Sequence, residues 1–174
     1  MSHTLSIVMR EDQPVLSIQT RTSMNDLPET ILQSLMKVGQ YLERIGAQPS
    51  GPAFVGYYNL DLRDSSVEIG FPVQDNLAGN GEVMANIIPG GPAGVCLYTG
   101  PYQDLATVYQ QLNTYIEGQG REPTGVSYEF YLNDPAVTPP NELETQIIFP
   151  LVGEKERSSG NGRVHTLFWQ SVKN

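Results

Sequence analysis

A glutamate set among aromatic residues is the position of this sequence most suited to chemistry. It lies in the run Tyr128-Glu129-Phe130-Tyr131, where the alternation of a strand places Glu129 and Tyr131 on one side. A buried carboxylate without a Lys or Arg partner is costly, and the positive charge of a ligand can supply that partner. Tyrosine rings attract cations by roughly 0.5–2 kcal/mol each. These residues indicate a site for an organic cation, although a Glu–Tyr alternation is equally typical of a strand facing water.

An internal repeat supplies the elements that must position this glutamate. The hexapeptide Gly46–Gly51 recurs as Gly120–Gly125, both with the pattern Gly-x-x-Pro-(Ser/Thr)-Gly. Apolar residues at helical spacing precede each copy, at Ile31–Ile45 and at Leu105–Ile116. A pair of strands is predicted before each helix and another pair after each hexapeptide. The predicted strands are Leu5–Met9, Val15–Thr20, Phe54–Leu60 and Val67–Phe71, then Val83–Ile88, Val95–Thr99, Val126–Leu132 and Thr145–Phe149.

This order predicts an α+β fold, a single domain over residues 1–174 made of two strand–strand–helix–strand–strand halves, 5–73 and 82–152. The two strands before each helix are expected to form hairpins, and the turn Pro89-Gly90-Gly91-Pro92 suits one of them. The eight strands are expected to form an antiparallel sheet with both helices on one face. A ninth strand, Val164–Val172, is predicted within the extension 153–174. A ligand crevice is expected at the pseudo-twofold axis between the halves.

Strand alternation predicts which side chains face this crevice. We expect the apolar set with Tyr128 and Phe130 to pack under the helices, and Glu129 to lie on the opposite face together with Ser127. On the closing strand, Thr145, Ile147 and Phe149 are assigned to the core. The residues predicted to contact a ligand are Val55, Tyr57, Glu68, Glu129, Tyr131, Gln146 and Ile148.

Composition excludes several classes of function. The net charge of −9 repels nucleic-acid backbones and weakly favours cations. The lone Cys96 forms no internal disulfide and lies in an apolar strand, which favours a core thiol in a reducing compartment. His3 and His165 lie at opposite ends of the chain, so we expect no metal site, and we expect no cofactor. No apolar run reaches the ~20 residues that span a bilayer. A cytoplasmic protein without membrane contact is expected.

Three motifs resemble the gyrase-inhibitor-like (GyrI-like) family. They are Thr99-Gly100-Pro101-Tyr102, the segment Tyr128–Pro135 with its Glu-x-Tyr-Leu-x-Asp-Pro pattern, and Thr145–Leu151 with Thr-x-Ile-x-x-Pro-Leu. The resemblance covers roughly residues 5–152 and implies the same repeated fold. It also implies that Glu129, with Tyr131 beside it, meets a ligand's positive charge at the bottom of an aromatic pocket. Many relatives have a second Glu where this chain has Gln146.

The resemblance leaves three functions open. The family includes effector-binding domains of MerR-type and AraC-type multidrug-responsive regulators, which implies binding of a hydrophobic cationic small molecule. Some members hydrolyse strained electrophiles, for which Glu129 would be the general base. Others bind a protein partner such as gyrase, and a homodimer or a separate regulator is a further possibility. Only four residues precede the first predicted strand, so we expect no helix-turn-helix in this chain.

Overall fold

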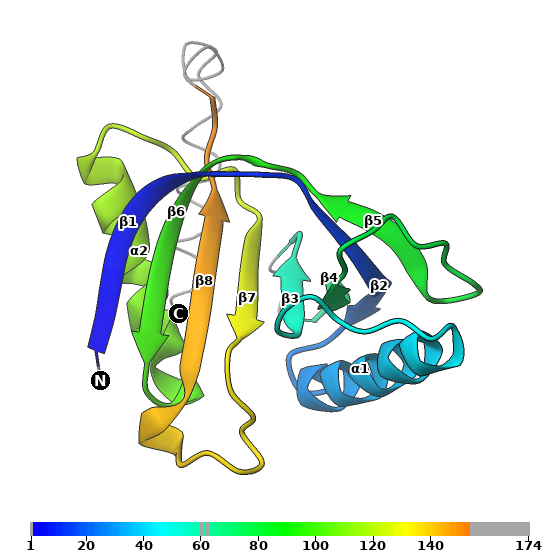
Figure 1. The fold of residues 1–174 in the computed structure, drawn as a ribbon. Helices are drawn as coiled ribbons and strands as arrows, with labels where there is room; N and C mark the ends of the chain where they lie inside the picture. The colour runs from blue at the N-terminus through cyan, green and yellow to red at the C-terminus, as the bar shows by residue number, and fades with distance from the viewer. Residues whose placement is uncertain (1, 60, 62, 154–174) are drawn as a thin grey trace. The chain divides into compact units, whose positions relative to one another are not determined.

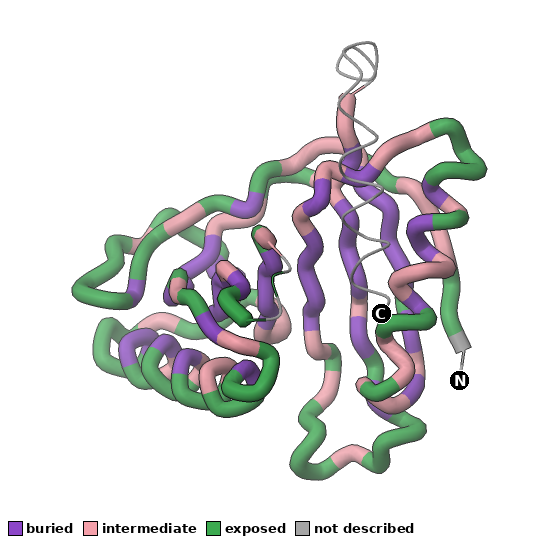
Figure 2. Tube along the Cα trace, turned by 180° about the vertical axis from the view of Figure 1, so that it is seen from behind, coloured by how far each residue is buried: buried purple, intermediate pink, exposed green. Residues whose placement is uncertain are grey.

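The computed structural model describes residues 2–59, 61 and 63–153, and the predicted strand Val164–Val172 lies outside them. Internal contacts divide the chain into two units. The N-terminal unit comprises residues 11–90, and the C-terminal unit comprises the residues up to 10 together with those from 91 onward. Figure 1 shows the ribbon of each unit, and Figure 2 shows the burial along the chain.

The N-terminal unit is a four-stranded antiparallel sheet with one helix. The helix α1 (Leu27–Arg44) packs on strands β4 and β2. Its inward residues Val38, Tyr41 and Leu42 form one buried cluster with Leu16 and Ile18 of β2. The strands, in their order across the sheet, are β3 (Phe54–Tyr57), β4 (Ser65–Pro72), β2 (Gln13–Thr22) and β5 (Met84–Ile88).

The C-terminal unit repeats this plan. The helix α2 (Leu105–Gly118) follows a short 3-10 turn η1 (Tyr102–Asp104) and contacts β6 and β1. Gly94 of β6 lets the helix approach, because a Cβ there would lie 2.4 Å from Ile116 Cδ1. A second 3-10 turn, η2 (Pro140–Glu142), precedes β8. The strands, in order, are β1 (Ser2–Arg10), β6 (Gly91–Thr99), β8 (Glu144–Pro150) and β7 (Ser127–Tyr131).

Eight strands and two helices confirm the predicted α+β class for the described residues. The two hexapeptides also behave alike. Gly46 and Gly120 both end a helix with φ of 72°, a conformation that glycine adopts without steric cost. The backbone N–H of Ser50 donates to the carbonyl of Pro72, and that of Thr124 donates to Pro150, each at 2.9 Å. Among the described residues, no helix is long and apolar enough to cross a membrane.

The predicted hairpins are wrong. β1 pairs with β6, Ser2 opposite Thr99, and β2 pairs with β5 and β4. Each unit therefore contains one strand of the other repeat. β1, from the first repeat, lies in the C-terminal unit, and β5, from the second repeat, lies in the N-terminal unit. The segment between β1 and β2 is hydrogen-bonded to the segment between β5 and β6, because the backbone N–H of Gly90 donates to the carboxylate of Asp12 at 2.6 Å. Alternation within a strand gives its buried face but says nothing about which strand it pairs with.

Two glycines allow a test of this packing with the same substitution. Gly70→Ala is expected to lower the free energy of unfolding by about 1–3 kcal/mol, because the new Cβ would lie 2.1 Å from the backbone oxygen of Leu16. Gly39→Ala is expected to raise it by about 1 kcal/mol, the usual cost of a glycine inside a helix, because nothing lies within 4 Å of that Cβ. Urea denaturation measures both. Changes of the same sign would contradict the described backbone contact.

Candidate functional site

Glu129 lies on the side of the C-terminal sheet that α2 covers. The Phe149 ring of β8 meets the Tyr109 ring of α2, with centroids 5.2 Å apart in an edge-to-face arrangement, which marks this side of the strand. Ile147 is two residues before Phe149, so it points the same way. Glu129 pairs directly with Ile147 in the β7–β8 ladder and therefore shares this side. The Glu129 residue is only 6% exposed.

Two tyrosine hydroxyls hold the carboxylate. Tyr109 of α2 donates a short hydrogen bond to Glu129 Oε2. Tyr131, two residues along β7, donates to Oε1 at 2.9 Å. The two ion pairs among the described residues, Arg21–Asp64 and Lys37–Glu82, lie in the N-terminal unit. Glu129 is thus a buried acid with neutral donors.

The environment of Glu129 favours its protonated form. Burial raises the pKa of the Glu129 carboxyl, and the hydrogen bonds from Tyr109 and Tyr131 partly oppose that shift. Tyr102 of η1 completes the aromatic surroundings, with its ring centroid 5.8 Å from that of Tyr131. Burial, followed by the charges of Glu129 and Asp134, raises the pKa of Tyr102. A cation placed here would compensate the charge that the site otherwise disfavours.

The predicted assignment of faces is wrong for β7. Tyr128 and Phe130 lie on the side away from α2, because Tyr128 pairs with Ile148 and Phe130 with Gln146. Gln146 and Ile148 were predicted beside Glu129, yet they lie on the opposite side of their sheet. Every residue from Ser127 to Phe130 is buried, so alternation had no exposed side to identify.

A cation on that opposite side was not predicted from the sequence. The Arg10 guanidinium of β1 lies 6.0 Å from the centroid of the Phe130 ring. Burial lowers the pKa of Arg10. This cation–π contact belongs to the side that carries Gln146 and Ile148, and it gives Glu129 no partner.

The predicted residues of the N-terminal unit also separate. Val55 pairs with Ile69, and Tyr57 with Val67. Ile69 pairs in turn with Ile18 of the α1 cluster, so Val55 and Tyr57 lie on the α1 side. Glu68 neighbours both Val67 and Ile69 along β4 and therefore lies on the side away from α1. The expectation that Tyr57 and Glu68 share a face is wrong.

Glu68 is a buried carboxylate with a fuller set of donors than Glu129. It is 0% exposed. Its Oε2 accepts from Ser17 at 2.6 Å and from Asn86 at 2.8 Å, and its Oε1 accepts a short bond from Tyr58. Glu68 thus accepts three hydrogen bonds within its own unit where Glu129 accepts two, so its burial is compensated more fully.

Several buried polar atoms of the C-terminal unit have no hydrogen-bond partner among the described residues. They include Ser127 Oγ of β7, Thr145 Oγ1 of β8 and Asn113 Oδ1 of α2. Ser127 and Thr145 are 0% exposed, and Asn113 is 4% exposed. Ser127 is two residues from Glu129 and Thr145 is two residues from Ile147, so both lie on the α2 side. Buried polar atoms normally have hydrogen-bond partners, so these oxygens have hydrogen-bonding capacity that the described residues do not use.

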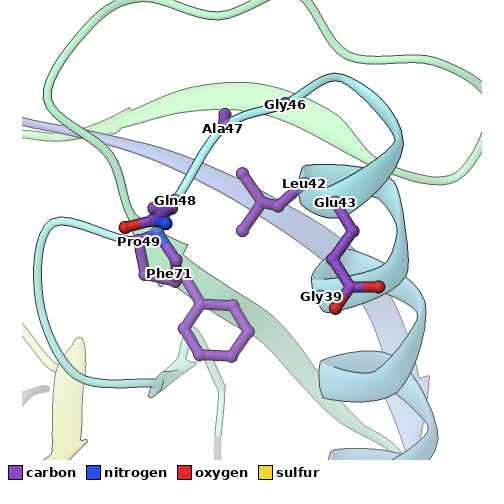
Figure 3. A pocket seen from close by; sticks show the side chains of 8 residues that line it. All are labelled: Gly39, Leu42, Glu43, Gly46, Ala47, Gln48, Pro49 and Phe71. Carbon is purple, nitrogen blue, oxygen red and sulfur yellow. The ribbon is translucent and has the colours of Figure 1, made fainter.

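A separate surface pocket lies in the N-terminal unit, at the end of α1 (Figure 3). Its volume is about 470 Å³. Leu42 and Glu43 of α1 form one wall, and Phe71 of β4 lies opposite, beside the turn that begins at Gly46. The lining includes none of the predicted site residues, and Glu43 is exposed. Apart from Glu43, its lining carries no charged side chain.

A reactive thiol and a metal cluster would be the other candidate centres. Cys96 is fully buried, and burial raises the pKa of its thiol to about 11, which confirms a core thiol rather than a nucleophile. Within residues 2–59, 61 and 63–153, no three His, Cys, Asp or Glu residues are grouped so that they could hold a metal ion.

Comparison with known proteins now identifies the family. A family model for the GyrI-like small molecule binding domain matches residues 3–152. The chain belongs to the GyrI-like family. The match spans the described part of both units and includes Glu129 and its two tyrosine partners. No curated protein matches the chain in sequence.

Solved structures share this GyrI-like fold at low identity. EcmrR in a cryo-EM complex with DNA has a TM-score of 0.73 and 20% identity over 86% of this chain, which spans only 57% of that one. The crystal structure of the EcmrR C-terminal domain has a TM-score of 0.70 and 22% identity, covering 87% of this chain and 99% of that domain. SAV2435 bound to tetraphenylphosphonium has a TM-score of 0.58 and 13% identity, covering 91% and 99%. A hydrolase from Listeria innocua has a TM-score of 0.64 and 14% identity, covering 86% and 92%.

Sequence reasoning missed the α2 contribution to this GyrI-like site. Tyr109 lies within the predicted helical run Leu105–Ile116 and was not among the residues predicted to contact a ligand. Its position corresponds to Leu35 in the first repeat. A tyrosine in a core-facing stripe needs a partner for its hydroxyl, and Glu129 is that partner. The need for a partner for the Tyr109 hydroxyl was the signal in the sequence that could have indicated this contact.

Proposed function

We propose that this GyrI-like protein binds a hydrophobic organic cation against Glu129. The observation that carries the proposal is a buried carboxylate held by the hydroxyls of Tyr109 and Tyr131, without a cationic partner among the described residues. Such a group gains most from a ligand that brings a positive charge and little water. Tyr102 and Phe149 add aromatic edges and faces suited to a flat or bulky apolar cation.

The comparisons support the binding of a small molecule. The family model is for small molecule binding. A structural relative, SAV2435, holds tetraphenylphosphonium, a bulky apolar cation. Of the residues predicted from the sequence, the proposal keeps Glu129 and Tyr131 and adds Tyr109 and Tyr102.

The test compares two probes of the same shape and opposite charge. Tetraphenylphosphonium and tetraphenylborate are titrated separately into the protein by isothermal calorimetry at pH 8. We expect micromolar binding of the cation and binding of the anion at least about tenfold weaker. Equal affinities would reject recognition of charge, and the absence of cation binding would reject the proposed function.

Hydrolysis is the second candidate. Burial raises the pKa of Glu129, and a carboxylate with a raised pKa is suited to general-base catalysis at neutral pH. Incubation with strained electrophiles such as epoxides, followed by mass spectrometry, distinguishes the candidates. Binding alone predicts unchanged substrate, whereas hydrolysis predicts product that disappears in the Glu129→Gln variant.

A further inference from the structure

The pocket at the end of α1 can be compared position by position with the same place in the second repeat, because both turns are held alike. The backbone N–H of Ala47 donates to the carbonyl of Leu42 at 2.9 Å. In the second repeat, the N–H of Arg121 donates to the carbonyl of Ile116 at 3.1 Å. Together with the matching glycines and strand contacts described above, these bonds give each lining residue a counterpart in the C-terminal unit.

The two repeats differ at lining positions that set the width of the pocket. Gly39 of the first repeat corresponds to Asn113 of the second. Ala47 corresponds to Arg121. A Cβ added at Gly39 would have nothing within 4 Å, so the helix leaves open space there. A glycine inside a helix lowers stability relative to alanine, so the first repeat keeps this space at a cost in stability.

The second repeat indicates what the open space can hold. Phe149 is fully buried, whereas its counterpart Phe71 is partly exposed beside the pocket. Arg121 starts from the position of Ala47, and its Nε atom is buried although the residue as a whole is half-buried. This difference is expected where a long side chain that carries a guanidinium replaces the methyl group of Ala47.

Glu43 supplies the negative charge for such a group. Its counterpart Glu117 accepts a hydrogen bond at 3.4 Å from the side-chain amide of Asn113, a donor that Gly39 cannot provide. Neither of the two ion pairs among the described residues includes Glu43. The Glu43 side chain lies on the pocket wall opposite Phe71 (Figure 3). A guanidinium suits this arrangement, because it is planar, forms paired hydrogen bonds with a carboxylate and stacks on an aromatic ring.

We propose that the pocket at the end of α1 is a second ligand site, for a small organic molecule that carries a guanidinium or amidinium group. Glu43 pairs with the cation, and Leu42 and Phe71 contact the apolar part of the molecule. The volume of about 470 Å³ falls in the usual range for small-molecule sites, roughly 300–1,000 Å³. All the lining residues belong to the N-terminal unit, so this site is distinct from that of Glu129.

Phenylguanidine and phenylurea test the recognition of charge, because they are similar in shape and only phenylguanidine is a cation. Each is titrated at pH 7.5 and low salt into the ¹⁵N-labelled protein, where the amide signals of Gly39 and Gly46 report on this pocket. We expect phenylguanidine to bind with a Kd of about 1 mM or below and about fivefold more tightly than phenylurea, the effect of a partly exposed ion pair. N-acetylarginine amide represents the arginine side chain of a protein partner. It should bind more weakly than phenylguanidine, because it lacks the aryl group that contacts Leu42 and Phe71.

Substitutions in the N-terminal unit assign the binding to this pocket. Glu43→Gln should weaken phenylguanidine about fivefold and leave phenylurea unchanged. Ala47→Arg introduces the side chain of the second repeat and should abolish the binding of both compounds at these signals. Glu29→Gln makes the same change as Glu43→Gln in the first turn of α1 and should leave both affinities unchanged. Thermal melts verify that each variant is folded.

Several results would overturn the second site. Equal affinities for phenylguanidine and phenylurea, or an unchanged Kd in Glu43→Gln, would exclude recognition of the cation. Retained binding in Ala47→Arg would exclude this pocket, and tighter binding of N-acetylarginine amide would exclude a small molecule as the ligand. Glu129→Gln should weaken tetraphenylphosphonium without changing phenylguanidine binding at the Gly39 and Gly46 signals. The proposed function therefore stands or falls separately from this site.

Discussion

Replacing Glu129 with Gln is expected to weaken tetraphenylphosphonium binding by at least about 30-fold at pH 8. Truncating one partner of a desolvated charge pair typically costs 2–5 kcal/mol, and 2 kcal/mol corresponds to about 30-fold in Kd. Glutamine keeps the shape of the side chain and still accepts from Tyr131, so the loss reports charge. Isothermal calorimetry on the two proteins measures it.

Glu68→Gln is the matched control for this prediction, because it makes the same change at another buried carboxylate. Glu68 already accepts hydrogen bonds from Ser17, Asn86 and Tyr58. We expect its replacement to leave the affinity within about twofold and to lower the free energy of unfolding by about 1–3 kcal/mol. Comparable losses of binding in both variants would refute the assignment to Glu129.

The second large effect is a pH dependence with opposite signs for binding and for stability. Burial raises the pKa of Glu129 from its ordinary value of 4.5 in the folded protein. Tetraphenylphosphonium keeps its charge at every pH, so only the protein titrates. Its affinity should rise as the pH increases from 4.5 through the raised pKa, because the carboxylate forms over that range.

The stability of the unliganded protein should fall over the same range. A carboxyl with a raised pKa binds its proton more tightly in the folded state than in the unfolded state. It therefore stabilises the fold below pH 4.5, and that contribution is lost as the pH rises through the folded pKa. Urea denaturation of wild type and Glu129→Gln at several pH values measures the difference, which should grow in favour of the variant. Parallel curves would contradict the raised pKa.

Removing Tyr109 sharpens the same experiment. Its hydroxyl lowers the pKa of Glu129 by favouring the ionised form. Tyr109→Phe should therefore move the binding curve to higher pH while leaving the maximal affinity of the ionised site little changed. A uniform loss of affinity without a shift along the pH axis would contradict this effect of the Tyr109 hydroxyl on the pKa of Glu129.

Local sequence patterns were sufficient for the elements but not for their partners. The eight strands and two helices follow from apolar spacing and turn residues, and the observed ends differ by only a few residues, as in Val67–Phe71 against Ser65–Pro72. The choice of β6 as the partner of β1 depends on contacts far apart in the chain. No alternation within either strand contains that information.

The site shows the same division between local and distant information. Glu129 stood out because a charged residue in an otherwise buried strand needs a compensating partner. Its face was misassigned because both sides of β7 are buried, so apolar Tyr128 and Phe130 did not mark the helix side. The contribution of Tyr109 depends on the packing of α2 over the C-terminal sheet, which the spacing of apolar residues in the helix does not fix.

The exchange of β1 also sets an order of assembly during synthesis. The N-terminal unit draws all its strands from residues 11–90, so its sheet can close before the remainder is made. β1 is made before β6 but pairs with it along its length, as far as Thr99. At bacterial or eukaryotic synthesis rates that wait lasts on the order of 5–20 s. Throughout it, the run from Leu5 to Met9 is an unpaired strand available to chaperones, and β1 can enter its sheet only after the strands of the N-terminal unit have been made.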